Sequence, residues 1–429
     1  MERSGTATST DTIVAAVLDR AAEQGIDPAW LKDEVVEFYR DLHRYPELSG
    51  TEYRTQWAIG EALAVADVWF QECTPSGLVA VLRNGPGPVV WVRADTDALP
   101  LTEQTGLPYA STVTQELPDG SVVGVMHACG HDVHTAALVG CLRQLDRERD
   151  GWSGTVVGIF QPAEETGRGA LAMLDELLNG EPAEHVPRPD VVYAQHVTSA
   201  PLGRVVCRPG WFLSHQRSWR VTVQGRGGHA SRPHLARDPI VAAASMVGTL
   251  QTVVSRAVDP FRMAVLTVGT FHAGTKENII PAEAVFTVSA RTYEPEVSQV
   301  VEETMRRILE GEAAAHGVSI RIEEVSDIPA CYNDPAATSQ VADALTGVFG
   351  DDVVAPPDPF PAADDFCHYA RVLGVPAVIW NFGVQAAELF DGDEPPPRNH
   401  DARFAPHPEH AVTLGVVAAT RAVTNYLRS

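Results

Sequence analysis

Short, nearly continuous apolar runs that alternate with helical patterns limit the fold of this chain more than any other feature. Four such runs read as buried strands: LVAVLR (78–83), VVWVRA (89–94), GTVVGIF (154–160) and VVYAQH (191–196). Helical spacing separates them, as in HTAALVGCLRQLDRE from residue 134 and GALAMLDELL at 169–178. Strands that are buried on both faces are typical of parallel sheets covered by helices. The pattern therefore predicts an α/β fold with a mixed, mostly parallel sheet flanked by helices.

The pattern changes after Pro209-Gly210. From there the order is strand, helix, strand, strand, helix, strand, which is the ferredoxin-like βαββαβ unit. We therefore expect an inserted domain at 211–327 and a discontinuous α/β domain at 13–210 and 328–429. A length of 429 residues agrees with two domains or three, because domains usually have about 100–200 residues. The proline-rich stretches 355–365 and 391–400 are predicted to be loops.

Charge and hydropathy exclude several classes of function. The chain has 56 acidic and 32 basic residues, a formal net charge of −24, and such a surface repels phosphate backbones and anionic membranes. We therefore expect neither a nucleic-acid partner nor a membrane partner. No stretch approaches the about 18 uninterrupted apolar residues that a transmembrane helix needs. The polar start MERSGTATSTDT lacks an apolar signal segment, so it reads as a frayed tail of a cytoplasmic protein.

The six cysteines are scattered and include no CxxC pair: Cys73, Cys129, Cys141, Cys207, Cys331 and Cys367. In a cytoplasmic chain this spacing predicts free thiols, most of them buried as small apolar side chains. Cys129 is the exception, because of its neighbours.

MHACGHDVH (126–134) is the densest cluster of possible metal ligands. It places one thiol, three imidazoles and one carboxylate within eight positions, from His127 to His134. These side chains bind borderline divalent ions such as zinc, and Gly130 allows the tight turn that would aim Cys129 and His131 at one centre. A plain polar turn is the less favoured reading. No second Cys/His pair lies nearby, so the spacing fits no zinc finger.

Two adjacent glutamates, Glu164 and Glu165, follow the strand at 154–160. Taken alone, they read as a solvated surface pair. Because sites form at the carboxyl ends of strands in α/β sheets, a metal cluster beside them reverses that reading. A metal-dependent hydrolase needs one carboxylate on the ion and a second one to take a proton from water.

Four further residues could support the same site. His196 ends a predicted strand and His400 lies in a proline-rich loop, although either one alone reads more readily as a structural histidine. Asp95 and Asp97 follow the strand VVWVRA, where they could form a turn or orient a ligating imidazole.

GRGGHASRPH (225–234) in the inserted segment is not a dinucleotide loop, because its glycine spacing is wrong for GxGxxG. Its glycines allow close backbone approach, so His229 could donate to a developing oxyanion. Asn278 is a second candidate there. Arg291 could hold a substrate carboxylate, with an edge-strand charge as the equal alternative.

With these segments in hand, the chain resembles the M20 family of metallopeptidases and aminoacylases, in its amidohydrolase branch. The matching segments span about residues 38–410 in family order: LHRYPELSGTEYRT, RADTDALPLTEQTGLPYAS, MHACGHDVHTAALVG, FQPAEETGRGA, AQHV, GRGGHASRPH, GTKENIIP and NHDARFAP. HACGHDVH followed about thirty residues later by PAEE is highly specific. The stretch SRPHLARDPIVAAASMVGTLQTVVSRAVDP is most similar to bacterial N-α-acyl-glutamine aminoacylases.

The resemblance implies a metal-dependent amidohydrolase that splits N-acyl amino acids into a carboxylic acid and a free amino acid. It implies two divalent ions per subunit, with zinc as the first candidate and manganese, nickel or cobalt as others. The implied ligands are Cys129, His131, Glu165, His196 and His400. Cys129 would bridge the two ions.

The resemblance also implies roles around the metals. Glu164 would be the general base, and Asp97 would support a ligand from behind. The inserted domain would act as a lid and as the contact of a homodimer, so that His229 would complete the site of the other subunit. Asn278 and Arg291 would contact the substrate.

Two departures concern the acyl pocket rather than the metal centre. PAADDF stands where the family usually has GSEDF, so Asp364 replaces a glutamate, and NHDA stands where it has NHSP.

Three alternatives stay open. An exopeptidase or dipeptidase of the same family would act on substrates with a free amine. A binding protein could keep the fold without catalysis, although the intact ligand set and Glu164 argue against it. A structural zinc protein is disfavoured by the paired glutamates.

Overall fold

The computed structural model of this chain describes residues 9–26 and 29–428. The chain divides into two compact units. The first runs up to Gly210 and continues with Tyr332–Asp358 and from His368 onward, and the second consists of Trp211–Cys331 and Pro359–Cys367. Each unit is described below by itself. The catalytic and lid roles assigned from the sequence stay predictions.

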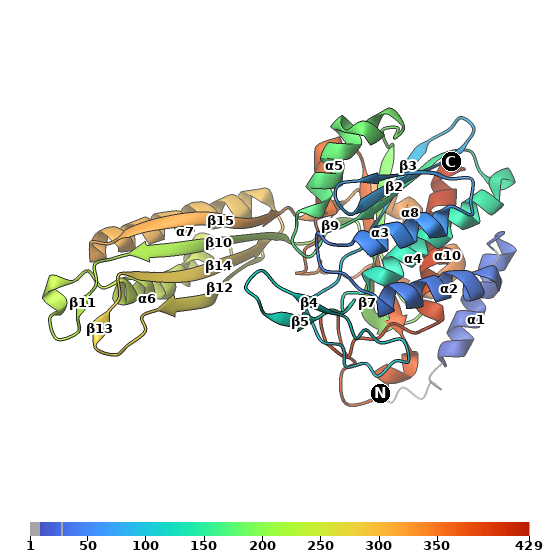
Figure 1. Cartoon of the computed structure of the whole chain (residues 1–429). Coiled ribbons are helices and arrows are strands. Elements are labelled where there is room, and N and C mark those ends of the chain that lie inside the picture. Colours follow the sequence, from blue (N-terminus) through green and yellow to red (C-terminus); the bar gives the residue numbers. More distant parts are fainter. Residues whose placement is uncertain (1–8, 27–28, 429) are drawn as a thin grey trace. The chain divides into compact units, whose positions relative to one another are not determined.

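An eight-stranded mixed sheet forms the centre of the first unit (Figure 1). Its strands are, in spatial order, β1 (Trp69–Cys73), β2 (Gly77–Asn84), β6 (Gly154–Gln161), β3 (Val89–Asp95), β7 (Val191–Pro201), β18 (Ala377–Gln385), β8 (Val205–Val206) and β17 (Val353–Val354). The pairs β6–β3, β3–β7, β7–β18 and β8–β17 are parallel, and the other three are antiparallel. All of β6 is buried, as expected for a strand covered on both faces. The predicted α/β class is confirmed.

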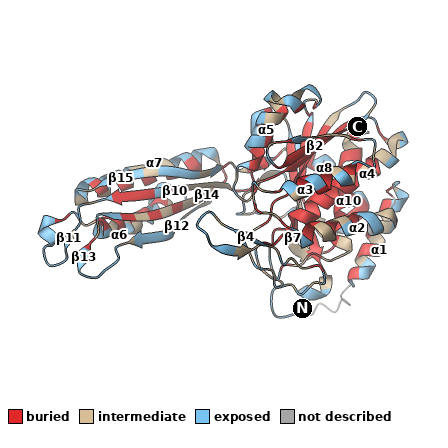
Figure 2. Cartoon of the chain, in the orientation of Figure 1, coloured by how far each residue is buried: buried red, intermediate tan, exposed pale blue. Residues whose placement is uncertain are grey.

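Helices cover this sheet. Those outside the inserted segment are α1 (Thr10–Glu23), α2 (Ala29–Arg44), α3 (Tyr53–Leu63), α4 (His131–Arg147), α5 (Gly169–Asn179), α8 (Pro335–Phe349), α9 (Cys367–Leu373) and α10 (His410–Leu427). The buried helices α4 and α10 pack on each other and against β3 (Figure 2). A Cβ at Gly140 would lie 2.5 Å from Val416 Cγ2, so this close approach of α4 and α10 requires glycine there.

Shorter elements complete the chain. A hairpin pairs β4 (Thr114–Glu116) with β5 (Val122–Gly124). β11 (Gly228–His229) pairs with β13 (Ile279–Ile280). The remaining strands are β9 (Gly210–Leu213) and β16 (Cys331–Asn333). The 3₁₀ turns are Arg149–Gly151, Glu181–Glu184, Pro233–Leu235, Gly350–Asp352 and Ala387–Phe390, and Val253–Ala257 is a π-helical turn.

The predicted tail ends earlier than expected. Residues 1–8 lie outside the described part of the chain. The expectation is wrong for residues 10–12, because α1 begins at Thr10 and Ser9 caps it by accepting a hydrogen bond from the Thr12 amide. The buried positions Val14, Val17 and Ala21 share one face of α1, which explains why this polar-looking start forms a helix.

The second unit is a four-stranded sheet with two helices. The strands are, in spatial order, β12 (Ala264–Ala273), β14 (Glu283–Thr292), β10 (His215–Gln224) and β15 (Ser319–Ile328), and all neighbours are antiparallel. The helices α6 (Pro239–Leu250) and α7 (Pro295–His316) pack together and on the sheet. Alternate residues of β10 and β14, such as Val221 and Phe286, form one core with Met246 and Leu309 from the helices. The chain order β10-α6-β12-β14-α7-β15 is consistent with the predicted ferredoxin-like unit.

Capping residues mark the start of α6 and the end of α7. Asp238 accepts hydrogen bonds from the Ile240 and Val241 amides at the start of α6. Gly317 ends α7 in the left-handed conformation with φ 66°. α6 ends at Leu250, and the π-helical turn Val253–Ala257 follows it.

The expectation that all six cysteines are thiols is wrong for two of them. Cys331 and Cys367 form a disulfide, because the fold brings their Cα atoms to 4.8 Å although 36 residues separate them in sequence. The other four, Cys73, Cys129, Cys141 and Cys207, are free and buried.

None of the described helices combines the length and the apolar composition that crossing a membrane would require.

Candidate metal centre and active site

The candidate ligands of the first unit come from the start of α4, from the loop after β6, from within β7 and from the loop before α10. His196 does not end its strand as predicted, because β7 continues to Pro201. The register of β3 on β6 places Asp95 beside Gln161 at the carboxyl edge of the sheet, directly before the loop that carries Glu164 and Glu165. α4 begins at His131, three residues earlier than the sequence pattern indicated. Its first turn therefore presents His131 at the same edge, where sites of α/β sheets form.

The five predicted ligands lie together. The Nε2 atom of His400 is 3.3 Å from Cys129 Sγ and 3.3 Å from Glu165 Oε1. Cys129 Sγ is 3.6 Å from His196 Nε2, and Glu165 Oε1 is 4.0 Å from His131 Nε2. One thiol, one carboxylate and three imidazoles thus surround a common centre. Their role as ligands stays a prediction.

The hydrogen bonding of this cluster fits metal ions. His131 Nε2 is buried and has no hydrogen-bond partner of acceptable geometry among the described residues. A buried polar atom without a partner is unfavourable, so such atoms call for a bound ion or water. Sulfur, nitrogen and carboxylate donors within 4.8 Å of one another are a set that suits borderline divalent ions.

The charges of the cluster also favour metal binding. Burial raises the pKa of the Cys129 thiol, but the imidazoles of His131 and His196 outweigh that effect and hold this pKa well below its ordinary value. This shift favours the thiolate of Cys129, the form that binds metals. Hydrogen bonds to Cys129 and Glu165 raise the pKa of His400 to about 10.

Asp97 supports two of the candidate ligands. Its Oδ1 atom lies 3.1 Å from His131 Nδ1, which leaves Nε2 of that ring directed at the cluster. Its Oδ2 atom accepts hydrogen bonds from the Glu165 amide at 3.0 Å and from Ser49 Oγ at 2.6 Å. The carboxylate predicted to stand behind a ligand therefore contacts one imidazole and one ligand backbone.

His134 belongs to the motif but cannot act as a ligand in this arrangement. Its Nδ1 atom lies 2.5 Å from Asp95 Oδ1, and its Nε2 atom accepts a hydrogen bond from the Val197 amide at 2.8 Å. Both ring nitrogens are thus occupied, and the proton must be on Nδ1. Asp95 is in turn paired with the buried Arg93, at 2.7 Å.

Glu164 is buried at 8% exposure, and its Oε2 atom is 4.0 Å from His131 Nε2. The residue before it, Ala163, has φ 56°, and His400 has φ 70°. Among the described residues only one other non-glycine residue, Thr74, has a positive φ. This conformation is unfavourable for residues with a Cβ and is typical of functional sites.

His43, a buried histidine with no role predicted from the sequence, contacts the segment 126–134 through Asp132. His43 is fully buried, with Nδ1 2.6 Å from Asp132 Oδ2 and Nε2 3.1 Å from Glu103 Oε1. Burial by itself would lower the pKa of His43, but the hydrogen bonds to the two carboxylates outweigh burial and raise this pKa to about 9. His43 therefore ties α2 and the loop at Glu103 to the first turn of α4.

The contacts of His43 with Asp132 and Glu103 predict that the free energy of unfolding depends on pH. The pKa of His43 is raised from its ordinary 6.5 to about 9, so its contribution is complete below pH 6.5 and is lost as the pH rises through about 9. The difference between the two pKa values corresponds to about 3 kcal/mol. Urea unfolding with a chelator present should show the stability advantage of wild type over His43→Gln shrinking by about that amount between pH 6 and pH 9.5. An advantage that does not change with pH would contradict this prediction.

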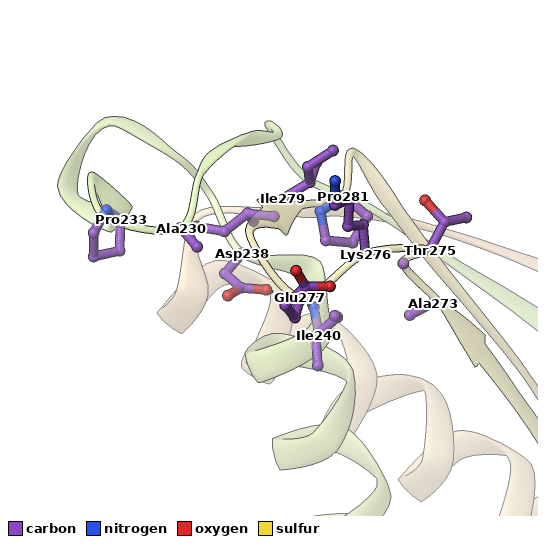
Figure 3. A pocket seen from close by; sticks show the side chains of 12 residues that line it. Ala230, Pro233, Asp238, Ile240, Ala273, Thr275, Lys276, Glu277, Ile279 and Pro281 are labelled. Atoms are coloured by element: carbon purple, nitrogen blue, oxygen red, sulfur yellow. Dashed lines mark hydrogen bonds between the residues drawn. The ribbon is translucent and has the colours of Figure 1, made fainter.

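The residues predicted in the inserted segment lie in the second unit. His229 is exposed on β11, and its Nδ1 atom accepts a hydrogen bond from the Ser231 amide at 3.1 Å. Asn278 lies beside it, since its carbonyl accepts a hydrogen bond from the Ala230 amide at 3.1 Å. His229 and Asn278 line one cavity of about 590 Å³. A neighbouring cavity of about 630 Å³ also has Lys276 in its wall (Figure 3). The residues that line it come from the segments 230–240 and 273–281.

Arg291 lies elsewhere in the same unit. It is half-buried on β14, where burial lowers the pKa of its guanidinium. His229 and Asn278 lie near the other end of this strand, because the Gly225 amide donates to the carbonyl of Ala282. Arg291 lies nine positions after Ala282, a span of about 30 Å at the rise of an extended strand. The structure does not bring Arg291 together with the other two within one chain.

Comparison with known proteins adds a finding to this geometry. The chain matches the model of the peptidase family M20/M25/M40 over residues 91–404. It is 35% identical over 347 residues to the N-acetylcysteine deacetylase of Bacillus subtilis (strain 168), which covers 79% of this chain and 86% of the relative. It is 33% identical over 349 residues to thermostable carboxypeptidase 1 of Saccharolobus solfataricus, with coverage of 80% and 84%.

A solved structure from Bacillus subtilis, described as a dinuclear metal-binding peptidase of the M20 family, is also similar. It has a TM-score of 0.74 and 29% sequence identity, and the match covers 93% of this chain and 99% of that one.

Proposed function

Because this chain belongs to the peptidase family M20/M25/M40, we propose that it hydrolyses the amide bond of N-acyl amino acids, releasing a carboxylic acid and a free amino acid. Relatives of this kind make it a metal-dependent hydrolase of amide bonds. One observation carries the proposal furthest: five mixed donors converge beside the buried Glu164. The similarity to an N-acetylcysteine deacetylase supports the acyl amino acid as substrate.

We propose that Cys129, His131, Glu165, His196 and His400 hold two divalent ions, with zinc as the first candidate. When bound, such ions polarise the amide carbonyl and lower the pKa of water. Glu164 takes the proton of the attacking water as the carbon–oxygen bond forms. It then delivers that proton to the nitrogen as the carbon–nitrogen bond breaks. Asp97 keeps His131 and the Glu165 backbone in place throughout.

Residues of the second unit complete the proposed site. His229 donates a hydrogen bond to the oxygen that gains negative charge, and Asn278 beside it contacts the substrate. Arg291 binds the substrate carboxylate, and its half-buried guanidinium has an Nη1 atom without a hydrogen-bond partner among the described residues.

The second unit supports a homodimer in which His229 serves the other subunit. His229 and Asn278 lie near one end of β14, and Arg291 lies near the other end, about 30 Å away. One acyl amino acid is far shorter than this distance. The two ends therefore serve different sites. β12 lies at the edge of the sheet, and Val265 and Phe271 on it are exposed at 44% and 40%, as expected for a strand that meets another copy.

A substrate panel tests the function. Protein stripped with a chelator and reloaded with one metal at a time is assayed on N-acetyl, N-benzoyl and longer N-acyl amino acids, and on dipeptides with a free amine. We expect kcat/KM to be at least about 100-fold higher for the acyl amino acids, because a site that pairs with specific polar groups rejects substrates that leave them unpaired. Preference for the dipeptides, or for N-blocked peptides as the carboxypeptidase relative suggests, would favour the exopeptidase alternative.

His229→Ala should keep its metal but lower kcat by about 10²–10³-fold, the usual value of one oxyanion donor. Metal analysis and steady-state kinetics measure both effects. If His229 acts across the dimer, co-expression of tagged His229→Ala and Glu164→Gln subunits should restore activity in the purified heterodimer, since one site is then intact. An inactive heterodimer would mean that His229 serves its own subunit or none.

A further inference from the structure

We propose that Glu52 is a positioning residue that holds Ala163, the residue before Glu164, in its left-handed conformation and so directs both Glu164 and Glu165. The inference deepens the proposed function, because it depends on these two carboxylates being the base and a metal ligand. It starts from a side chain that the proposed chemistry does not use.

Glu52 is a buried carboxylate that binds backbone amides and a hydroxyl. Its residue is 0% exposed, and Oε1 accepts hydrogen bonds from the amides of Gly50 and Ala163, both at 2.9 Å. Oε2 accepts from Ser76 Oγ at 2.6 Å. Burial raises the pKa of Glu52 to about 7. These contacts join the start of α3 and the turn between β1 and β2 to the loop that follows β6.

Ala163 is the point at which that loop turns. Its φ of 56° is unfavourable for a residue with a Cβ, so something must hold it there. The amide of Ala163 donates a hydrogen bond to Glu52. The carbonyl of Ala163 accepts hydrogen bonds from Thr166 Oγ1 at 3.1 Å and from the Gly169 amide at 3.2 Å. The conformation is therefore fixed from both sides of the residue.

A rotation at Ala163 would move Glu164 and Glu165 together, because they follow it directly. The second anchor of this segment is Asp97, which accepts a hydrogen bond from the Glu165 amide and also from Ser49 Oγ. Two carboxylates, Glu52 and Asp97, thus bind the amides of the residues directly before and after Glu164. Both depend on the same short segment, because Glu52 is one of these carboxylates and Ser49 donates a hydrogen bond to the other, Asp97.

Helix capping does not explain Glu52. It occupies the N-cap position of α3, yet its side chain makes no capping hydrogen bond. Glu47 performs that task, because its carboxylate accepts hydrogen bonds from the amides of Arg54 and Thr55 at 3.0 and 2.8 Å. Glu47 is therefore a matched control: it is a carboxylate of the same segment that binds two backbone amides but does not contact Ala163.

The test separates side-chain length from charge. Glu52→Gln keeps the length, and its Oε1 can still accept both amides, so we expect kcat and Zn²⁺ affinity within about threefold of wild type. Glu52→Asp keeps the charge but is one methylene too short to hold the Ala163 amide. It should lose about 10–100-fold in kcat and in Zn²⁺ affinity, the usual effect of removing a partner behind a metal ligand, while KM changes less. Zn²⁺ affinity is measured by competition with a chromogenic chelator.

Glu47→Gln and Glu47→Ala provide the control for stability. Glu47→Ala should lower Tm by removing a helix cap, but both variants should keep kcat and Zn²⁺ affinity within about threefold of wild type. If Glu47→Ala reproduces the losses of Glu52→Asp, or if Glu52→Asp is active and Glu52→Gln is not, the proposal is overturned. The Zn²⁺ readout needs no substrate. A wild type that hydrolyses no acyl amino acid would therefore count against the proposed function alone, and native Zn²⁺ affinity in Glu52→Asp would count against Glu52 alone.

Discussion

Glu164→Gln should bind its metal ions as wild type does and lose about 10³–10⁴-fold in kcat, the upper part of the range for general acid–base catalysis. The two side chains have nearly the same shape, and the amide still accepts hydrogen bonds, but it cannot take up the proton of water. Glu164 is buried and lies 4.0 Å from His131 Nε2, so no bulk solvent base can easily replace it. Metal analysis and kinetics with saturating substrate measure the two effects separately.

Glu165→Gln is the informative partner of this variant. Its Oε1 atom lies within 4.8 Å of Cys129 and His400, so its loss should release metal as well as activity. If Glu164→Gln instead loses metal and Glu165→Gln retains it, the two neighbours have exchanged roles. Near-normal turnover in Glu164→Gln would mean that the base is another residue.

Part of the candidate metal site could be predicted from sequence because its signal is local. Cys129 and His131 lie two residues apart at a helix start, and Glu164, Glu165 and His196 follow or end strands that read clearly as buried. Because parallel strands end at one edge, the paired glutamates are expected near the start of α4. The register of β3 on β6 brings this about. The ligand roles of His196 and His400 are implied by the family resemblance alone.

The residues that support the cluster could not be predicted in the same way. Glu52 and His43 look like ordinary surface residues of an amphipathic segment, and only the fold reveals that both are buried. The positive φ of Ala163 has no signature, because alanine is a poor choice for that conformation. The one available signal was the segment PELSGTE, which matched the family but had no assigned chemistry.

Contacts between residues distant in sequence could not be predicted, for a different reason. Cys331 and Cys367 carry no spacing signal, and the expected cytoplasmic location argued for thiols, yet the fold places them within bonding distance. The separation of His229 from Arg291 along β14 was equally invisible before strand pairing was known. Periodicity predicts elements, whereas side-chain partners depend on register and packing.

Cys129→Ser and His131→Ala should each lose bound metal and activity together. Cys129 Sγ lies within 3.6 Å of the Nε2 atoms of His196 and His400, so it is central to the cluster. A serine hydroxyl is a far weaker ligand than a thiolate, and alanine provides none. We expect metal affinity to fall by more than the about 10–100-fold that removal of a partner behind a ligand costs. Elemental analysis after gel filtration measures the metal, and the same samples are assayed for turnover.

Cys141→Ser is the matched control for this last prediction. Cys141 is also fully buried and belongs to α4, but burial raises the pKa of its thiol to about 12, so it behaves as a small apolar side chain. Its replacement by serine should lower stability and leave metal content and turnover close to wild type. If Cys129→Ser and His131→Ala keep full metal occupancy, the five-residue site is wrong. If Cys141→Ser loses as much metal as Cys129→Ser, the loss reflects damage to α4 rather than removal of a ligand.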